Sequence, residues 1–107
     1  MDAVDGGGIY LVTDSQYAER LFRLVNRQHG KCGICRQLMS WQDAVDIHHA
    51  RAHNTVANRH RWPHCIEHDD NLLVAHHEPC HMGKPNYGRW TERQMDAWEA
   101  KLAAADT

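Results

Sequence analysis

The chain has 107 residues and a mass of 12.4 kDa, which suits a single small domain. Hydrophobic residues make up 42% of it and charged residues 24%, a composition that excludes a disordered chain. The formal net charge of −2 excludes a strong overall attraction to nucleic acid. The apolar stretch Ile9–Val12 is far shorter than the roughly 20 residues that cross a bilayer. No charged start precedes an apolar run, so we expect neither a membrane protein nor an exported one.

The amino-terminal part predicts a flexible leader followed by a helix. Residues 1–8 end in three glycines, and 9–12 read as a short strand. A helix is predicted over 15–29, because apolar residues recur at helical spacing at Tyr17, Leu21, Leu24 and Val25. Its start carries the capping-box pair Thr13 and Gln16. Gly30 stands where a carboxyl-terminal cap belongs.

The rest of the chain predicts two strands, a long loop and two helical segments. Strands are expected over 44–49, where apolar and polar residues alternate, and over 72–75. The stretch 50–70 shows no periodicity and is predicted to be a functional loop. Pro79 begins a helical turn that Gly83 and Pro85 keep short. A last helix is predicted over 91–104, so the fold class is α+β and residues 1–107 form one domain.

Four cysteines and ten histidines predict a metal site. Without export, cysteines at such spacing are metal ligands more often than disulfides. Cys32 and Cys35 have the spacing of a zinc knuckle, and we expect His77 and Cys80 to complete a structural zinc site. Two alternatives stay open, which are His76 in place of His77 and the pair Cys65 and His68. The same argument predicts a reducing, cytoplasmic location.

Further polar residues follow the knuckle in a set order. Asp46, His48 and His49 end the first strand, Asn71 precedes the second, and His81 follows the last cysteine. This order, over residues 32–85, resembles the HNH endonucleases of the His-Me finger (ββα-metal) superfamily. The acidic-x-His-His part is similar to colicin nuclease domains, and the zinc knuckle to group II intron proteins and small phage and bacterial HNH nucleases. The resemblance implies a zinc-stapled ββα-metal core flanked by a helix at each end.

The resemblance also implies chemistry. It makes His49 the general base that activates water for hydrolysis of DNA phosphodiester bonds. It makes His48 and His81 ligands of a catalytic Mg²⁺, Mn²⁺ or Ni²⁺ ion. Position 85 is a proline and offers no further ligand. Asp46 or Asn71 is therefore expected to complete the coordination shell of the catalytic ion. Asn71 has an alternative role, which is to fix the loop.

A basic stretch accompanies these residues. From Arg27 to Arg61 there are six basic residues against two acidic ones. Phosphate contacts are expected from Arg51, Arg59 and Arg61, and Trp62 is expected either to stack on a base or to anchor the loop. The partner is then DNA, nicked by a monomer or cut through by a homodimer, alone or within a phage, intron or defence assembly. The alternative is a non-catalytic zinc module that binds nucleic acid or protein.

Overall fold

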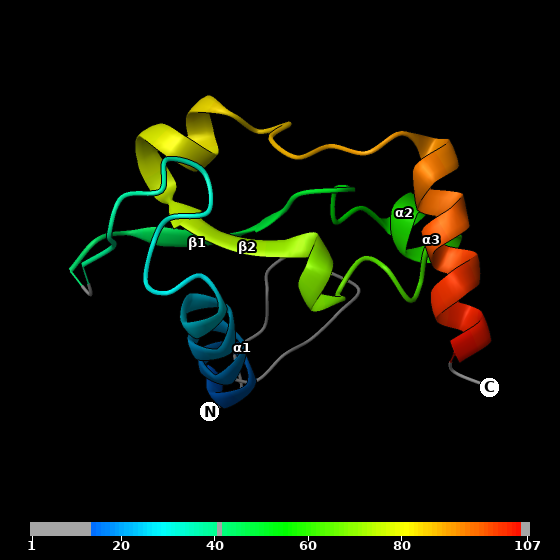
Figure 1. The fold of residues 1–107 in the computed structure, drawn as a ribbon, viewed down its shortest axis with the longest axis horizontal. Coiled ribbons are helices and arrows are strands. Elements are labelled where there is room, and N and C mark those ends of the chain that lie inside the picture. The colour runs from blue at the N-terminus through cyan, green and yellow to red at the C-terminus, as the bar shows by residue number, and fades with distance from the viewer. Residues whose placement is uncertain (1–13, 41, 106–107) are drawn as a thin grey trace.

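The computed structural model describes residues 14–40 and 42–105. They form a two-stranded antiparallel sheet with helices around it, so the expected α+β class is confirmed. Figure 1 shows α1 against one side of the sheet, and α2 and α3 together at the far end of the molecule. The expected leader, the strand over 9–12 and the cap at Thr13 lie outside the described residues.

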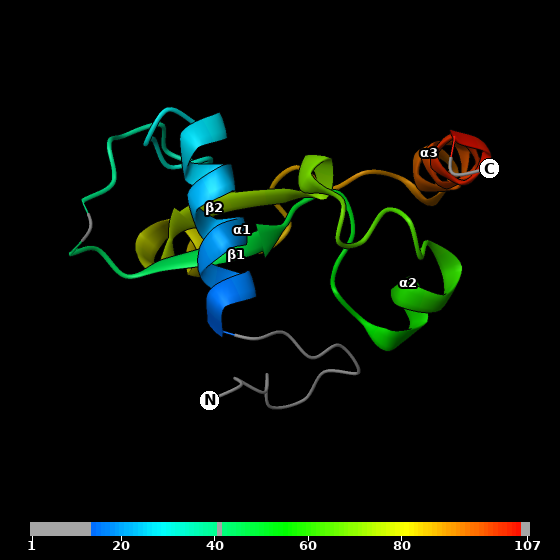
Figure 2. The same cartoon turned by 90° about the horizontal axis from the view of Figure 1, so that it is seen from below.

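Helix α1 spans Asp14–Arg27 and packs on the sheet through its apolar stripe. Leu24 is 1% exposed and belongs to a core cluster with Leu72 and Val74 of the second strand. The helix ends as expected, because Gly30 has a φ of 75° and donates its N–H to the carbonyl of Val25. Burial of this stripe fixes α1 across the sheet, as Figure 2 shows from below.

Strand β1 spans Val45–His49 and strand β2 spans Leu72–His76, close to the predicted limits. Val45 pairs with His76 and His49 with Leu72, so the polar end of β1 lies beside the start of β2. Side chains alternate between the two faces of a strand. Ile47 therefore packs toward α1, while Asp46 points to the opposite face.

The loop that carries the first two cysteines is held against β2 by a close approach of backbones. Gly33 donates its N–H to the carbonyl of Val74 at 2.9 Å. A Cβ atom at Gly33 would lie 2.9 Å from a methyl carbon of Leu73, nearer than side chains approach one another. A residue with a Cβ here would force the Leu73 side chain to move, so glycine suits the close approach of the cysteine loop to the strand.

The stretch 50–70 is not a structureless loop, and this prediction is wrong in part. Helix α2 spans Val56–Arg61, and a short 3-10 turn, η1, spans Asp69–Asn71. Six residues are too few to show a helical period in the sequence, but the Thr55 hydroxyl accepts the N–H of Asn58 and caps α2. Trp62 is 5% exposed and donates its indole N–H to Asp96 at 2.7 Å, so it anchors the loop.

Helix α3 spans Glu92–Ala105 and covers this second core. Its capping box is formed as predicted, since Thr91 and Gln94 exchange hydrogen bonds of 2.9 and 3.1 Å. Met95 is 1% exposed within a cluster of buried apolar residues, which are Ala52, Trp62, Cys65 and Ile66. The apolar side of α3 thus packs against other residues of the same chain.

The remaining element is the helical segment η2, which spans His77–His81 and lies between β2 and α3 in the chain. It is less regular than the predicted helical turn, because Glu78 has extended dihedral angles of −131° and 143° inside it. The chain kinks at this residue, and η2 packs against both strands of the sheet. Within residues 14–40 and 42–105, every helix falls short of the length and apolar character that crossing a bilayer requires.

Candidate metal centres and a pocket beside one of them

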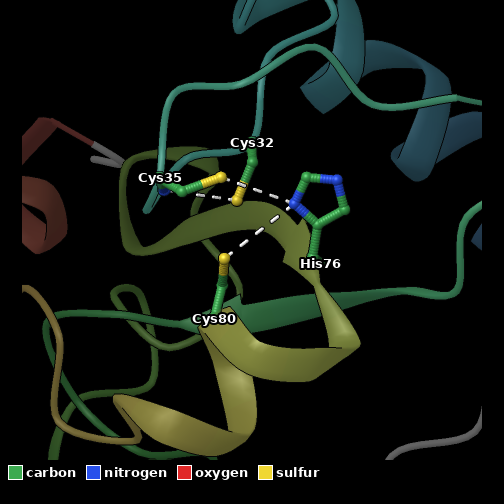
Figure 3. Close-up of side chains that lie close together, drawn as sticks. All are labelled: Cys32, Cys35, His76 and Cys80. Carbon is green, nitrogen blue, oxygen red and sulfur yellow. Dashed lines mark hydrogen bonds between the residues drawn. The ribbon is translucent and has the colours of Figure 1, made fainter.

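Three cysteines and one histidine converge at the end of the sheet (Figure 3). Cys32 and Cys35 come from the loop after α1, His76 from the last position of β2, and Cys80 from η2. Their ligand atoms all lie within 4.8 Å of one another, and His76 Nδ1 is 3.5 Å from the Cys35 sulfur. Three sulfurs and one imidazole nitrogen so close together are compatible with a structural metal such as zinc.

Asp43 orients the histidine of this cluster. His76 Nε2 lies 3.3 Å from the Asp43 carboxylate, which also accepts the N–H of Ser40 at 2.7 Å. A carboxylate on one ring nitrogen fixes the tautomer that leaves the other nitrogen free to bind a metal. The preference for His77 is therefore corrected, and its alternative His76 completes the set. The sequence could not separate them, because they are neighbours at the junction of β2 and η2 and spacing does not record which way each side chain points.

The thiols of this cluster influence one another's ionisation. Burial raises the pKa of Cys32, but backbone N–H groups, those of Ile34 and Cys35 among them, stabilise its thiolate and lower the pKa to about 6. Burial and the neighbouring cysteines raise the pKa of Cys80 to about 11. Cys32 therefore ionises more readily than Cys80, and a dication would relieve the repulsion between neighbouring thiolates.

The competing pair, Cys65 and His68, takes no part. Cys65 is fully buried among apolar side chains, and its pKa is raised to about 12, by burial first and then by Glu99. His68 stacks edge-on against Trp98 with ring centroids 5.4 Å apart. Cys65 is consequently an inert packing residue rather than a ligand.

A second group of potential ligands lies on the face of β1 that points away from α1. One oxygen of Asp46 accepts hydrogen bonds from His77 Nδ1 at 2.7 Å and from His81 Nδ1 at 2.6 Å. Burial opposes the charge of Asp46, but the two imidazoles lower its pKa, and the carboxylate in turn raises the pKa of His77. Two nitrogens and one oxygen meeting at a point form a donor set that suits a divalent transition metal.

This second group faces an open pocket of about 370 Å³. His49 lines the same pocket, although it points to the other face of β1 from Asp46. Side chains from both faces of β1 can line one pocket if the pocket runs along the free edge of the strand. This is the edge of β1 that does not pair with β2. The pocket therefore brings the expected base beside Asp46 and His81, two of the expected ligands.

His48 does not join this group. It is 2% exposed, and its Nε2 donates to the backbone carbonyl of Tyr87 at 2.9 Å. Burial, the largest influence, lowers its pKa, so the ring is neutral and serves packing. Its ring lies edge-on to that of His81 with centroids 5.2 Å apart, so His48 packs against this group without belonging to it. His77 stands where His48 was expected.

Asn71 is bound entirely within the protein. It is 0% exposed, and its oxygen accepts the N–H groups of Arg51 and Ala52 at 2.8 and 3.0 Å. Its amide nitrogen donates to the carbonyls of Ala52 and Ile66. With every hydrogen-bonding position used, Asn71 fixes the loop and is not free to bind a metal.

Replacing Asn71 should destabilise the fold strongly. The Asn71→Ala variant leaves buried backbone groups without partners, at a cost of roughly 3 kcal/mol in the free energy of unfolding. Urea denaturation followed by circular dichroism measures this. The control is Asn26→Ala on the exposed side of α1, which should change stability by only a few tenths of a kcal/mol. A similar midpoint for both variants would contradict this role of Asn71.

The three arginines expected to contact phosphate all have partners within the chain. The Arg51 guanidinium lies 3.9 Å from the ring centre of Trp90 and also stacks on Trp98. Arg61 binds Glu92 and Asp96 of α3. Arg59 lines the pocket described above and binds Glu67 at 2.5 Å. Of the three, only Arg59 borders the candidate site.

Glu67 is the site residue that the sequence did not reveal. Its carboxylate binds Arg20 at 3.0 Å, Arg59 at 2.5 Å and His49 Nε2 at 3.3 Å. Burial alone would raise its pKa, but the hydrogen bond and charge of His49 and the two guanidiniums lower it to about 2. Its partners are spread over α1, β1 and α2, so no local spacing could have found it.

The fold and its centres define a small α+β chain with a Cys3His cluster suited to a structural metal and a second, mixed carboxylate and histidine group on a pocket. Comparison with protein-family profiles, curated proteins and solved structures finds no match. The function is therefore argued from the site itself.

Proposed function

We propose that this protein is a metal-dependent endonuclease of the HNH family that hydrolyses phosphodiester bonds of DNA. One observation carries the proposal: a single pocket holds a group that can bind a divalent cation and a histidine that can act as a base. Hydrolysis of a phosphodiester needs both, since water must lose a proton while negative charge grows on the phosphate. The order β1, β2, η2 is the order that a ββα-metal core requires.

The two metal centres have separate tasks in this proposal. The Cys3His cluster, with zinc as its ion, fixes the cysteine loop, β2 and η2 to one another. Asp46, His77 and His81 are the residues that would hold the catalytic cation, which would stabilise charge on the scissile phosphate when bound. This set replaces the expected ligand His48 with His77.

The chain's own residues supply the proton transfer. His49 takes a proton from a water molecule in the pocket, and the resulting hydroxide attacks phosphorus while the bond to the 3′ oxygen breaks. The leaving 3′ oxygen takes up a proton from solvent water, which gives 5′-phosphate and 3′-hydroxyl ends, and His49 later releases its proton to solvent. A neutral imidazole is a suitable base near pH 7.

A supercoiled-plasmid assay tests the function. The zinc-loaded protein should convert supercoiled plasmid to open circles only when Mg²⁺, Mn²⁺ or Ni²⁺ is added. Conversion directly to linear DNA would show that two sites act together, as in a homodimer. If a folded, zinc-loaded protein cuts nothing with any of these ions, the proposal fails and a non-catalytic zinc module is the better reading.

A further inference from the structure

Glu67 lines the same pocket as His49 and is placed to orient that histidine. Its carboxylate is 19% exposed and lies 3.3 Å from His49 Nε2, while the His49 side chain is 17% exposed. A carboxylate accepts hydrogen bonds, so the proton of the neutral imidazole belongs on Nε2. His49 Nδ1 has no hydrogen-bond partner among the described residues, which leaves its lone pair for a ligand or a water molecule in the pocket.

Two arginines hold the carboxylate in turn. Arg20 reaches it from α1 and Arg59 from α2, and both guanidiniums are largely buried, with side-chain exposures of 19% and 14%. Each carboxylate oxygen faces one guanidinium, at 3.0 Å for Oε1 and 2.5 Å for Oε2. Ion pairs with arginines from two separate helices hold the Glu67 carboxylate in place. Its orientation toward His49 is therefore fixed from two sides.

We propose that Glu67 is a positioning residue for the base: it keeps the proton of His49 on Nε2, so that Nδ1 is the atom that removes the proton from water. The inference rests on the proposed function and names the atom that carries out its proton transfer. As the bond from water oxygen to phosphorus forms, the proton moves to Nδ1 and the imidazole becomes a cation. The negative charge of Glu67 then stabilises that cation through the hydrogen bond that already exists.

The test compares substitutions at two glutamates that each bind a histidine. Glu67→Gln keeps an acceptor oxygen but loses the charge, and Glu67→Ala loses both. Glu99→Gln is the matched control, because Glu99 is similarly buried and binds His64 Nδ1 at 2.5 Å, far from the pocket. Zinc content and thermal melting of every variant establish that it is folded, since Arg20 and Arg59 lose an ion pair.

The expected kinetic result is a change in turnover rather than in binding. In the plasmid assay, kcat should fall about 10-fold in Glu67→Gln and about 100-fold or more in Glu67→Ala. KM should stay within about twofold, and Glu99→Gln should match the wild type. A kcat within twofold of wild type in folded Glu67→Ala, with His49→Ala inactive, would overturn the inference and leave the proposed function intact.

Nuclear magnetic resonance of nitrogen-15-labelled histidine gives a second result that does not need activity. The His49 ring nitrogens should show the Nε2–H tautomer in the wild type and in Glu67→Gln, and a mixture or the other tautomer in Glu67→Ala. An unchanged tautomer in Glu67→Ala would overturn the positioning role. A wild type with the expected tautomer and no cleavage under any metal would instead overturn the proposed function.

Discussion

Removing the metal from the Cys3His cluster should unfold the protein. Structural zinc contributes on the order of 10 kcal/mol or more in small zinc domains, which equals or exceeds the whole stability of a typical domain. The cluster joins three segments that otherwise share little core, since their buried residues form one small group of Cys32, Ile34, Ala75 and Cys80. Thermal melting followed by circular dichroism, before and after treatment with a strong chelator, measures the effect.

The substitution Cys32→Ser should have the same effect as chelation. The matched control is Cys65→Ala, because Cys65 is equally buried but lies outside the cluster. The control should bind one zinc ion per chain and melt cooperatively, whereas Cys32→Ser should bind little zinc and show no cooperative transition. A melting curve that chelation leaves unchanged would show that the cluster is not a structural metal site.

The substitution His49→Ala should abolish cleavage and leave the fold intact. Loss of a general base slows a reaction about 100- to 10,000-fold, which removes visible nicking of plasmid DNA. Folding should survive, because Glu67 keeps its ion pairs with Arg20 and Arg59 when the imidazole is gone. The measurement is the nicking rate at matched zinc content and matched melting temperature.

The control for His49→Ala is a histidine of the same chain outside the pocket. His60 lies exposed on α2 and does not line the pocket, so His60→Ala should nick at the wild-type rate. Equal loss in both variants would point to a general effect of removing histidines. Nicking by His49→Ala at the wild-type rate would exclude His49 as the base.

Local sequence patterns were enough for most of the regular elements. The apolar stripe of α1 and the capping box of α3 each depend on residues within one or two helical turns, so periodicity and spacing identify them. The alternation of β1 likewise gave its limits to within a residue. Helix α2 was missed because its six residues contain none that is buried and therefore no apolar face.

The candidate site was predicted less completely, because its geometry depends on directions that spacing does not record. His76 and His77 both stand near Cys80 in the sequence, but His76 meets the sulfurs and His77 meets Asp46, a difference in direction that spacing does not record. His48 has the right position in the motif, but its ring nitrogen is bound to a carbonyl some forty residues later. Contacts of this kind arise from tertiary packing, which a single sequence does not encode as a local pattern.

The neighbouring histidines at the end of β2 have a consequence for how this chain can change. His76, the last residue of β2, belongs to one cluster, and His77, which follows it directly, belongs to the other, so the direction of β2 at its end places both. Inserting or deleting one residue within β2 would reverse both faces, so the two centres would be lost together. Length variation should therefore be absent from this strand among any descendants of the sequence.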